Sequence, residues 1–282
     1  MLIARTIAEL RAAVAKLRSE KKCIGLVPTM GALHEGHLSL VRAAKSHCGA
    51  VVVTIFVNPT QFGPNEDFAK YPRTFDADCA LLEKEAVDVV FAPEPAEIYP
   101  PGASTVVEVA GISDRLDGRS RPGHFVGVAT VVAKLFNIVQ PNHAFFGQKD
   151  AAQVAVLRGM VRDLHFNLEM IVCPTVREPD DLAMSSRNRY LSPQHRQQAL
   201  VLSRALRRVQ SEVAAGVVDA APLIDAGLAV LAKEPEIRVD YFSIVDPDTL
   251  ENVADVSAGA LVAVAAVVGP ARLIDNLLIA PR

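Results

Sequence analysis

The chain has 282 residues, of which 50% are hydrophobic and 22% charged, which is typical of a globular protein with a sizeable core. Lys and Arg number 29 and Asp and Glu 32, so the formal net charge of −3 gives no overall attraction to nucleic acid or to an anionic membrane. The amino-terminal run lacks the apolar segment of a signal peptide, and the most apolar stretch, 261–268, is far too short to cross a bilayer. We therefore expect a cytoplasmic protein with neither nucleic acid nor membrane as a partner.

The four cysteines stand at positions 23, 48, 79 and 173, with no CxxC pair and no histidine at zinc-ligand spacing from them. A disulfide framework is not expected in a long chain with so few cysteines. We expect four reduced thiols, packed mostly as small hydrophobic side chains.

Short β-branched runs alternate with helical patterns over the first 175 residues. This alternation predicts an α/β fold with a Rossmann-like, doubly wound parallel sheet, which binds ligands beyond the carboxyl ends of its strands. The expected strands are 23–27, 50–57, 87–91, 143–146 and 168–173, and the expected helices are 7–17, 37–47, 75–86, 128–139 and 151–163.

The pattern changes after about residue 176. A long helix is expected over 193–215, opened by Ser192 as N-cap and Pro193 at its first position, followed by a helix near 221–233. Strands are expected at 238–245, 260–268 and 272–279. We therefore predict two domains, 1–175 for the Rossmann-like part and 176–282 for a smaller α+β part that forms a lid over the site.

The segment 28–37, PTMGALHEGH, ends the first expected strand and opens the next helix. His34 and His37 are three residues apart, so they point the same way on a helical turn. Gly31 and Gly36 let a ligand approach the backbone, and the helix N-terminus adds N–H groups and partial positive charge. We interpret this segment as a site for a phosphate chain. A metal site is the weaker alternative, because no third ligand is near and zincins space their histidines at i and i+4.

Polar residues follow at three further junctions. The amide of Gln61 can donate to a carboxylate or hydroxyl and accept from an ammonium group, and Arg121 can bind a carboxylate or phosphate with two parallel hydrogen bonds. Lys149 can stabilise charge that develops on phosphorus, while Asp150 suits a ribose hydroxyl or an ion pair. Each of these residues, taken alone, is also compatible with an ordinary surface loop, and His124 is expected to be structural.

The HxGH element resembles the signature of the nucleotidyltransferase superfamily, and the run 184–187, MSSR, resembles a degenerate KMSKS loop of class I aminoacyl-tRNA synthetases. The hydroxyls and the guanidinium of the run 184–187 suit phosphate oxygens, and this run could act as a mobile lid. Together the motifs, from VPTMGALHEGH to ARLIDN, resemble the AMP-forming pantoate–β-alanine ligases, the pantothenate synthetases, over nearly the whole chain.

The resemblance implies a ligase that condenses (R)-pantoate and β-alanine to pantothenate through a pantoyl-adenylate, consuming ATP and releasing AMP and pyrophosphate. It also implies a place in coenzyme A biosynthesis, a Mg²⁺ requirement and a homodimer. His37, His34 and Lys149 would be the catalytic residues. Gln61 and Gln153 would bind substrate with Arg121 as a further candidate, and Asp78 would help to hold Mg²⁺. The ATP site would comprise Met30, Gly31, Ala32, Leu33, His34, Glu35, Gly36, His37, Gly147, Gln148, Lys149, Asp150, Val176, Met184, Ser185, Ser186 and Arg187.

The chain departs from the family pattern at three places. The family usually has Asp-Gly where this chain has Asp180-Asp181, and Asp costs more than Gly if that position requires a positive φ. An aromatic residue and Gln usually follow Lys-Asp, where this chain has Ala151 and Ala152. Ala77 thins the acidic cluster usual near Asp78.

The sequence is compatible with two rival functions. Another adenylate-forming enzyme of the same superfamily would share these motifs, although a tRNA synthetase fragment is disfavoured because no basic or anticodon-reading domain is visible. A non-catalytic regulator that binds ATP would share the fold, and fold alone does not decide function.

Overall fold

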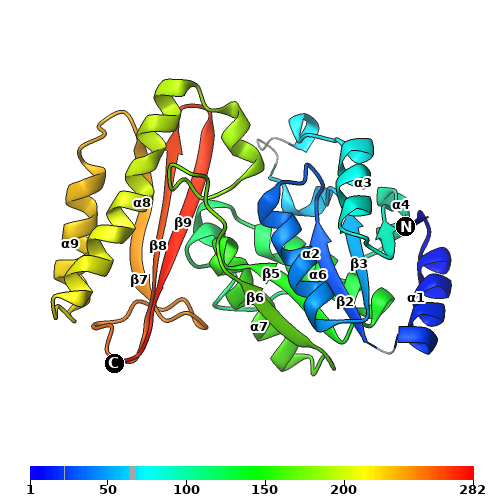
Figure 1. Ribbon diagram of the computed structural model, residues 1–282. Helices are drawn as coiled ribbons and strands as arrows, with labels where there is room; N and C mark the ends of the chain where they lie inside the picture. The colour runs from blue at the N-terminus through cyan, green and yellow to red at the C-terminus, as the bar shows by residue number, and fades with distance from the viewer. Residues whose placement is uncertain (22, 64–67) are drawn as a thin grey trace.

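The computed structural model describes residues 1–21, 23–63 and 68–282. Two sheets lie side by side (Figure 1): a parallel sheet in the order β1-β4-β3-β2-β5-β6 and an antiparallel sheet in the order β7-β8-β9. This confirms the predicted α/β class with a smaller α+β part. The strands are β1 Leu2–Ala4, β2 Ile24–Thr29, β3 Ala50–Ile55, β4 Val89–Phe91, β5 His143–Gly147, β6 Glu169–Cys173, β7 Arg238–Val245, β8 Ala260–Val268 and β9 Ala271–Ile279.

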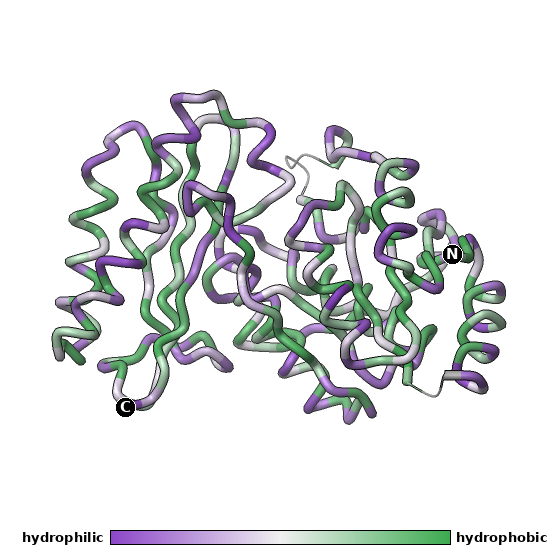
Figure 2. Tube along the Cα trace, viewed as in Figure 1, coloured by the Kyte–Doolittle hydropathy of each residue, from purple (hydrophilic) through white to green (hydrophobic). Residues whose placement is uncertain are grey.

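The central strands are apolar on both faces, as the run AVVVTI of β3 predicts. Successive side chains point to opposite faces, so Val52 packs into one hydrophobic cluster while Val51 and Val53 pack into another. The apolar colouring of this core and of the small sheet stands out against the polar outer turns of the helices (Figure 2). Burial on both faces therefore fixes β3 in the middle of the sheet.

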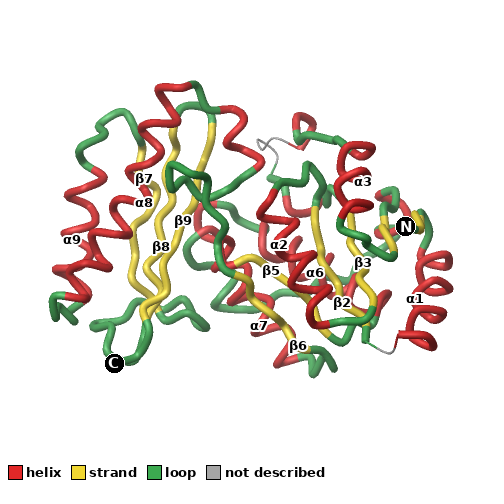
Figure 3. The backbone as a smooth tube through the Cα atoms, viewed as in Figure 1, coloured by secondary structure: helices red, strands yellow, loops and turns green. Residues whose placement is uncertain are grey.

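Helices cover both faces of the parallel sheet (Figure 3). α1, α6 and α7 contribute to the first cluster, and α2 and α3 to the second. The α-helices are α1 Ile7–Lys21, α2 Glu35–His47, α3 Phe75–Lys84, α4 Pro95–Ile98, α5 Asp117–Ser120, α6 His124–Val139, α7 Ala151–Asp163, α8 Pro193–Ala214 and α9 Ala220–Leu231, and the 3₁₀ helices are η1 Pro59–Gln61, η2 Phe68–Lys70, η3 Gln148–Asp150 and η4 Ser186–Tyr190.

The antiparallel sheet carries α8 and α9 on one face. The hydroxyl of Ser192 accepts the N–H of His195 at 3.1 Å, which caps α8 as expected. α9 approaches β7 closely at Gly227, where an added Cβ would lie 2.2 Å from the ring of Phe242. Leu261 of β8 joins the first cluster, so the two parts share packed surface. The boundary at residue 175 stays a prediction.

Most expected elements agree with the observed ones within a few residues, and the short elements β1, α4 and α5 were not among those expected. β1 was not predicted, because three residues are too few to show a periodicity. α6 begins at His124, four residues before the predicted start at 128, because Gly123 at φ 81° supplies the turn that opens the helix there. No helix among the described residues is long and apolar enough to span a bilayer.

The order of the strands reverses next to β2. From β2 the chain moves through α2 to β3 on one side, and it later places β5 on the other side. In such sheets the crevice for ligands lies beyond the carboxyl ends of the two strands at this switch point. Met30 follows the end of β2, and Gln148 follows the end of β5. The topology therefore brings the histidine segment 28–37 close to Lys149 and Asp150.

Candidate active site

Two histidines cap the N-terminus of α2 reciprocally. Nδ1 of His34 accepts the N–H of Gly36 at 3.2 Å, and Nδ1 of His37 accepts the N–H of His34 at 3.3 Å. This is a capping box in which imidazoles replace the usual hydroxyl and carboxylate. The two ring centroids are 4.1 Å apart, so the spacing seen in the sequence does bring the rings to one point.

The caps also determine what the rings offer to a ligand. Because each Nδ1 accepts a backbone hydrogen bond, the proton of each neutral ring sits on Nε2. Burial, and next the charge of Lys149, lowers the pKa of His34 to about 4, while burial, and next His34, lowers the pKa of His37 to about 3. At pH 7, without ligand, both rings are therefore neutral N–H donors.

The loop before α2 is held by a buried carboxylate. Asp78 accepts the N–H of Ala32 at 2.9 Å, the N–H of Leu33 at 2.8 Å and the hydroxyl of Thr74 at 3.1 Å. Gly31 and Ala32 have φ of 83° and 51°, so successive N–H groups converge on one acceptor, the arrangement called a nest. Asp78 is 2% exposed and lines a different hollow from the one that His34 and His37 line. Its contacts hold the loop.

Lys149 and Asp150 follow β5 at the same edge of the sheet. The ammonium of Lys149 lies 3.5 Å from the carboxylate of Asp150, and these side chains are 20% and 48% exposed. Burial by itself would raise the pKa of Asp150, but the nearby cations, Lys149 first, leave it lowered. The amide of Asn276 on β9 donates to the backbone carbonyls of Gln148 and Lys149 at 2.9 Å each, so the small sheet positions this turn.

Gln61 is held from two sides after β3. Nδ2 of Asn58 donates to Oε1 of Gln61 at 3.2 Å, and Nε2 of Gln61 lies 3.0 Å from the sulfur of Met30. The backbone carbonyl of Gln61 accepts from the ring of His124 at 2.8 Å and from the guanidinium of Arg121 at 3.3 Å. His124 therefore helps to hold the backbone of Gln61, and Arg121 lies beside the residue that was predicted to bind substrate.

The loop 176–188 is fastened to the C-terminal part. Arg177 makes two hydrogen bonds to Asp275 on β9, at 2.7 and 2.9 Å. Arg207 on α8 makes two hydrogen bonds to Asp181, both at 2.6 Å. Asp181 has φ 76°, so its backbone adopts the left-handed conformation. The departure from the family pattern, Asp in place of Gly, therefore falls at a position that does require a positive φ.

Three hollows meet at Asp150 and Gln153, which line all of them. The phosphate hollow is lined by Pro28, Met30, His34, Gly36, His37, Leu40, Tyr71, Phe145, Phe146, Gly147, Lys149, Asp150, Gln153, Pro174, Thr175, Val176, Met184, Ser185, Ser186 and Arg187. The inner hollow is lined by Pro28, Thr29, Met30, His37, Thr54, Phe56, Asn58, Gln61, Tyr71, Val128, Val131, Val132, Leu135, Phe146, Asp150 and Gln153.

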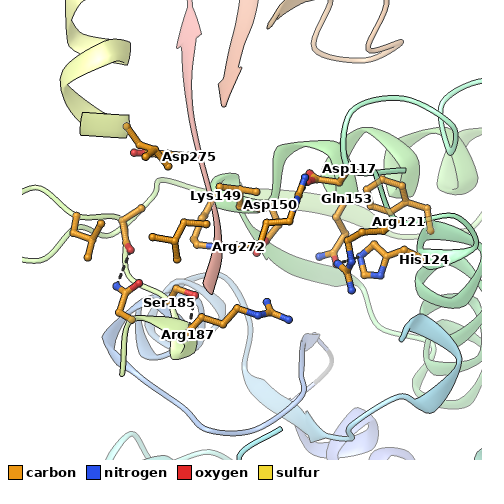
Figure 4. A pocket seen from close by; sticks show the side chains of 17 residues that line it. Asp117, Arg121, His124, Lys149, Asp150, Gln153, Ser185, Arg187, Arg272 and Asp275 are labelled. Carbon is orange, nitrogen blue, oxygen red and sulfur yellow. Dashed lines mark hydrogen bonds and ion pairs between the residues drawn. The ribbon is translucent and has the colours of Figure 1, made fainter. Parts of the chain in front are cut away.

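The outer hollow opens between the two sheets. Figure 4 shows Lys149 and Asp150 between the loop that carries Ser185 and Arg187 and the segment that carries Arg121 and His124. Arg272 of β9 pairs with Asp117 at 2.6 Å on this side, so both parts of the chain form the walls.

Most of the predicted residues converge on these hollows, and five predicted for the ATP site do not line the phosphate hollow. Gln148 donates to Asn276 at 3.0 Å, and Glu35 pairs with Arg42 at the surface. Gly31, Ala32 and Leu33 form the nest around Asp78. Sequence reasoning missed Asn58 and Tyr71, which line the inner hollow; the signal for Asn58 was its place at the end of a buried strand.

Comparison with known proteins decides the family. Residues 2–278 match the family model described as pantoate-beta-alanine ligase. The chain belongs to this family. Pantothenate synthetase of Acidobacterium capsulatum is 65% identical over 98% of this chain and 96% of that protein, and that of Thermotoga petrophila is 56% identical over 99% and 100%. Family membership confirms the expected class of activity, a ligase that joins pantoate and β-alanine.

Solved structures agree with this assignment. The crystal structure of pantothenate synthetase from Thermus thermophilus superposes with a TM-score of 0.95 at 49% identity, covering 100% of both chains. That of pantoate-beta-alanine ligase from Francisella tularensis, described as complexed with beta-gamma ATP and beta-alanine, has a TM-score of 0.81 at 36% identity and covers 99% of this chain and 97% of that one.

Proposed function

We propose that this chain makes pantothenate by activating (R)-pantoate with ATP and passing the pantoyl group to β-alanine. One observation carries the proposal. The phosphate hollow is lined by His34 and His37, whose Nε2–H groups can donate, by Lys149 and by the start of α2. It joins the inner hollow, which Gln61 lines, at Asp150 and Gln153. A triphosphate and a small polar acid would then meet at this junction.

The first half-reaction joins the acid to the nucleotide. The pantoate carboxylate attacks the α-phosphorus, an oxygen–phosphorus bond forms, and the bond to pyrophosphate breaks. Negative charge grows on the phosphoryl oxygens and on the departing pyrophosphate. His34 and His37 donate through Nε2–H, and Lys149 adds a positive charge, so fixed donors offset the new charge without a protein nucleophile.

The second half-reaction forms the amide. The β-alanine nitrogen attacks the pantoyl carbonyl, the bond to AMP breaks, and the ammonium that forms loses a proton. Gln61 can contact both organic substrates, because its amide both donates and accepts and lies where the inner hollow meets Met30 and His37. Positioning of the two reactants would supply much of the rate. The loop 176–188 would cover the adenylate and exclude water.

Mg²⁺ is the expected companion of the triphosphate and would supply positive charge beside the phosphates when bound. It binds largely through phosphate oxygens and water, so the protein needs to provide few ligands. Among the described residues that line the phosphate hollow, Asp150 is the only carboxylate, and it is partly exposed there. We propose Asp150 for this contact in place of Asp78, because the oxygens of Asp78 are used by backbone N–H groups.

We further propose that the enzyme works in the cytoplasm as a homodimer, on the basis of the family resemblance. Light scattering coupled to size-exclusion chromatography measures the mass in solution. A mass of twice 30.2 kDa supports the dimer, and a mass of 30.2 kDa at micromolar concentration contradicts it.

The decisive experiment follows pyrophosphate and AMP separately. With ATP, Mg²⁺ and pantoate alone, pyrophosphate should appear in an amount close to that of the enzyme, and AMP should follow only after β-alanine is added. Lys149→Ala is the matched inactive variant and should be slowed about 100-fold, or about 2.7 kcal/mol. A non-catalytic regulator would bind ATP and release neither product, and a different adenylate-forming enzyme would release pyrophosphate with another acid only.

A further inference from the structure

A second cluster of reactive side chains lies at the opposite end of the parallel sheet. Cys23 precedes β2, Cys48 is the C-cap of α2, and His143 opens β5. The sulfurs of Cys23 and Cys48 are 2.8 Å apart, and Nδ1 of His143 lies 3.5 Å from the first and 3.3 Å from the second. Cys23 and Cys48 are 25 positions apart, Cys48 and His143 are 95 apart, and Cys23 and His143 are 120 apart. Spacing in the sequence therefore could not reveal the cluster.

We propose that Cys23, Cys48 and His143 form a zinc site. Two thiolates and one imidazole are a ligand set that suits Zn²⁺, with the fourth position taken by water. Cys23 and His143 are both partly exposed, which leaves a route for the ion and the water. Binding replaces two S–H bonds with two zinc–sulfur bonds and releases two protons to solvent.

The distances fit this ion with a small adjustment. A thiolate sulfur and an imidazole nitrogen on one tetrahedral zinc lie about 3.5 Å apart, and two thiolate sulfurs about 3.8 Å apart. Both sulfur-to-nitrogen distances already match. The sulfurs have to separate by about 1 Å, and the partly exposed Cys23 has room to move.

The surroundings supply two further features of a metal site. Nε2 of His143, the nitrogen that faces away from the sulfurs, lies 3.4 Å from the carboxylate of Glu169. A carboxylate behind a metal-binding histidine orients the ring and makes it a better ligand. The cluster also lies at the C-terminus of α2, where the helix dipole favours a cation.

The site would tie three elements together far from the chemistry. α2 has 13 residues, so its C-terminal end lies about 20 Å from the histidine cap at its N-terminal end. A zinc ion here would fix that end of the helix to the amino ends of β2 and β5. We expect it to raise the melting temperature and to leave turnover unchanged.

A disulfide between the two cysteines is the competing interpretation. It would use only the sulfurs and would give no part to His143 or Glu169. Counting free thiols in protein purified without metal or reductant distinguishes the two, because a zinc site that has been stripped retains four reactive thiols after denaturation, whereas a disulfide leaves two.

The test uses the full chain after removal of metal with a chelator. Zn²⁺ is titrated against a chromophoric competitor, Co²⁺ is used as a spectroscopic substitute, and melting is followed with and without Zn²⁺. We expect one ion per chain, a sulfur-to-cobalt charge-transfer band, a melting temperature raised by several degrees and a kcat within twofold of the metal-free value. The cobalt band separates this site from His34 and His37, which have no sulfur ligand.

Variants make the result specific. Cys23→Ser should weaken zinc binding at least 100-fold, and Glu169→Gln, which keeps all three ligands, about tenfold. Cys79→Ser removes a thiol outside the cluster and should change neither affinity nor spectrum. Fewer than 0.2 zinc ions per chain at 100 µM, equal affinity in Cys23→Ser, a cobalt adduct without the sulfur band or only two free thiols would each overturn the proposal.

Discussion

Nδ1 of His37 accepts the backbone N–H of His34 at 3.3 Å, so a residue expected to touch phosphate also caps the helix that carries it. The same ring therefore has a structural and a chemical role on its two nitrogens. Removing the whole side chain would mix these effects, and a substitution that keeps the cap would separate them.

His37→Gln is the substitution that keeps the cap. Gln at the third helical position can accept the N–H of residue 34 through its side-chain oxygen, as in an ordinary capping box. We expect His37→Gln to melt within about 2 °C of the parent and to lower kcat about 100-fold. His37→Ala should lose about 1 kcal/mol of stability as well as activity. Steady-state kinetics and calorimetry measure both, and kcat of His37→Gln within threefold of the parent would reject the catalytic role.

The lowered histidine pKa values predict how stability depends on pH. The unfolded chain binds protons to His34 and His37 below about pH 6.5, whereas the folded, ligand-free chain resists doing so until about pH 4 and 3. Unfolding therefore takes up protons, and the free energy of unfolding should fall as pH drops from about 6.5 towards 4. Melting temperatures of the parent and of His37→Gln across this range give the comparison. If the melting temperature of His37→Gln falls with pH as steeply as that of the parent, the lowered pKa of His37 is contradicted.

Gln61→Ala should impair the use of both organic substrates. Gln61 is 9% exposed and lines the inner hollow but not the phosphate hollow. We expect KM for pantoate and for β-alanine each to rise about tenfold or more, with little change for ATP. Asn58→Ala, which removes the donor to Oε1 of Gln61, should give a weaker change in the same direction. If only the KM for ATP moves, Gln61 has been placed in the wrong hollow.

Asp78→Asn separates holding the loop from binding metal. The amide keeps one acceptor, but its NH₂ group faces a backbone donor, so we expect a loss of about 2 kcal/mol in stability and a lower kcat. The Mg²⁺ concentration that gives half-maximal activity should stay within threefold of the parent value. A Mg²⁺ requirement raised tenfold without a change in melting temperature would instead make Asp78 a metal ligand.

Asp181 combines a backbone cost with an ion pair. Asp181→Gly relieves the left-handed backbone, worth about 1 kcal/mol, and loses the pair with the exposed Arg207, worth about 0.5 kcal/mol, so stability should change little. Asp181→Ala loses the pair and keeps the cost, so it should be about 1 kcal/mol less stable than Asp181→Gly. Denaturant unfolding of the two variants measures the difference. Equal stabilities would mean that the φ of 76° carries no cost here.

Local patterns were enough for much of this molecule. The continuous apolar runs predicted the buried strands, since a strand covered on both faces has no polar positions to spare. The three-residue spacing of His34 and His37 predicted that the rings meet, and their centroids are 4.1 Å apart. His34 is the extended N-cap and not part of the helical turn, so the reciprocal capping hydrogen bonds bring the two rings together. The departure at Asp181 correctly pointed to a backbone position that favours glycine.

What the sequence determined by itself was the class of fold, the capped turn of α2 and the family, because these depend on residues close together or in fixed order. Only the tertiary structure decided that Asp78 holds the nest at Ala32, that Asn276 positions the turn before Lys149 and that Cys23 meets His143. These pairs are 46, 127 and 120 residues apart. Their meeting depends on strand order and helix packing, which no short spacing records.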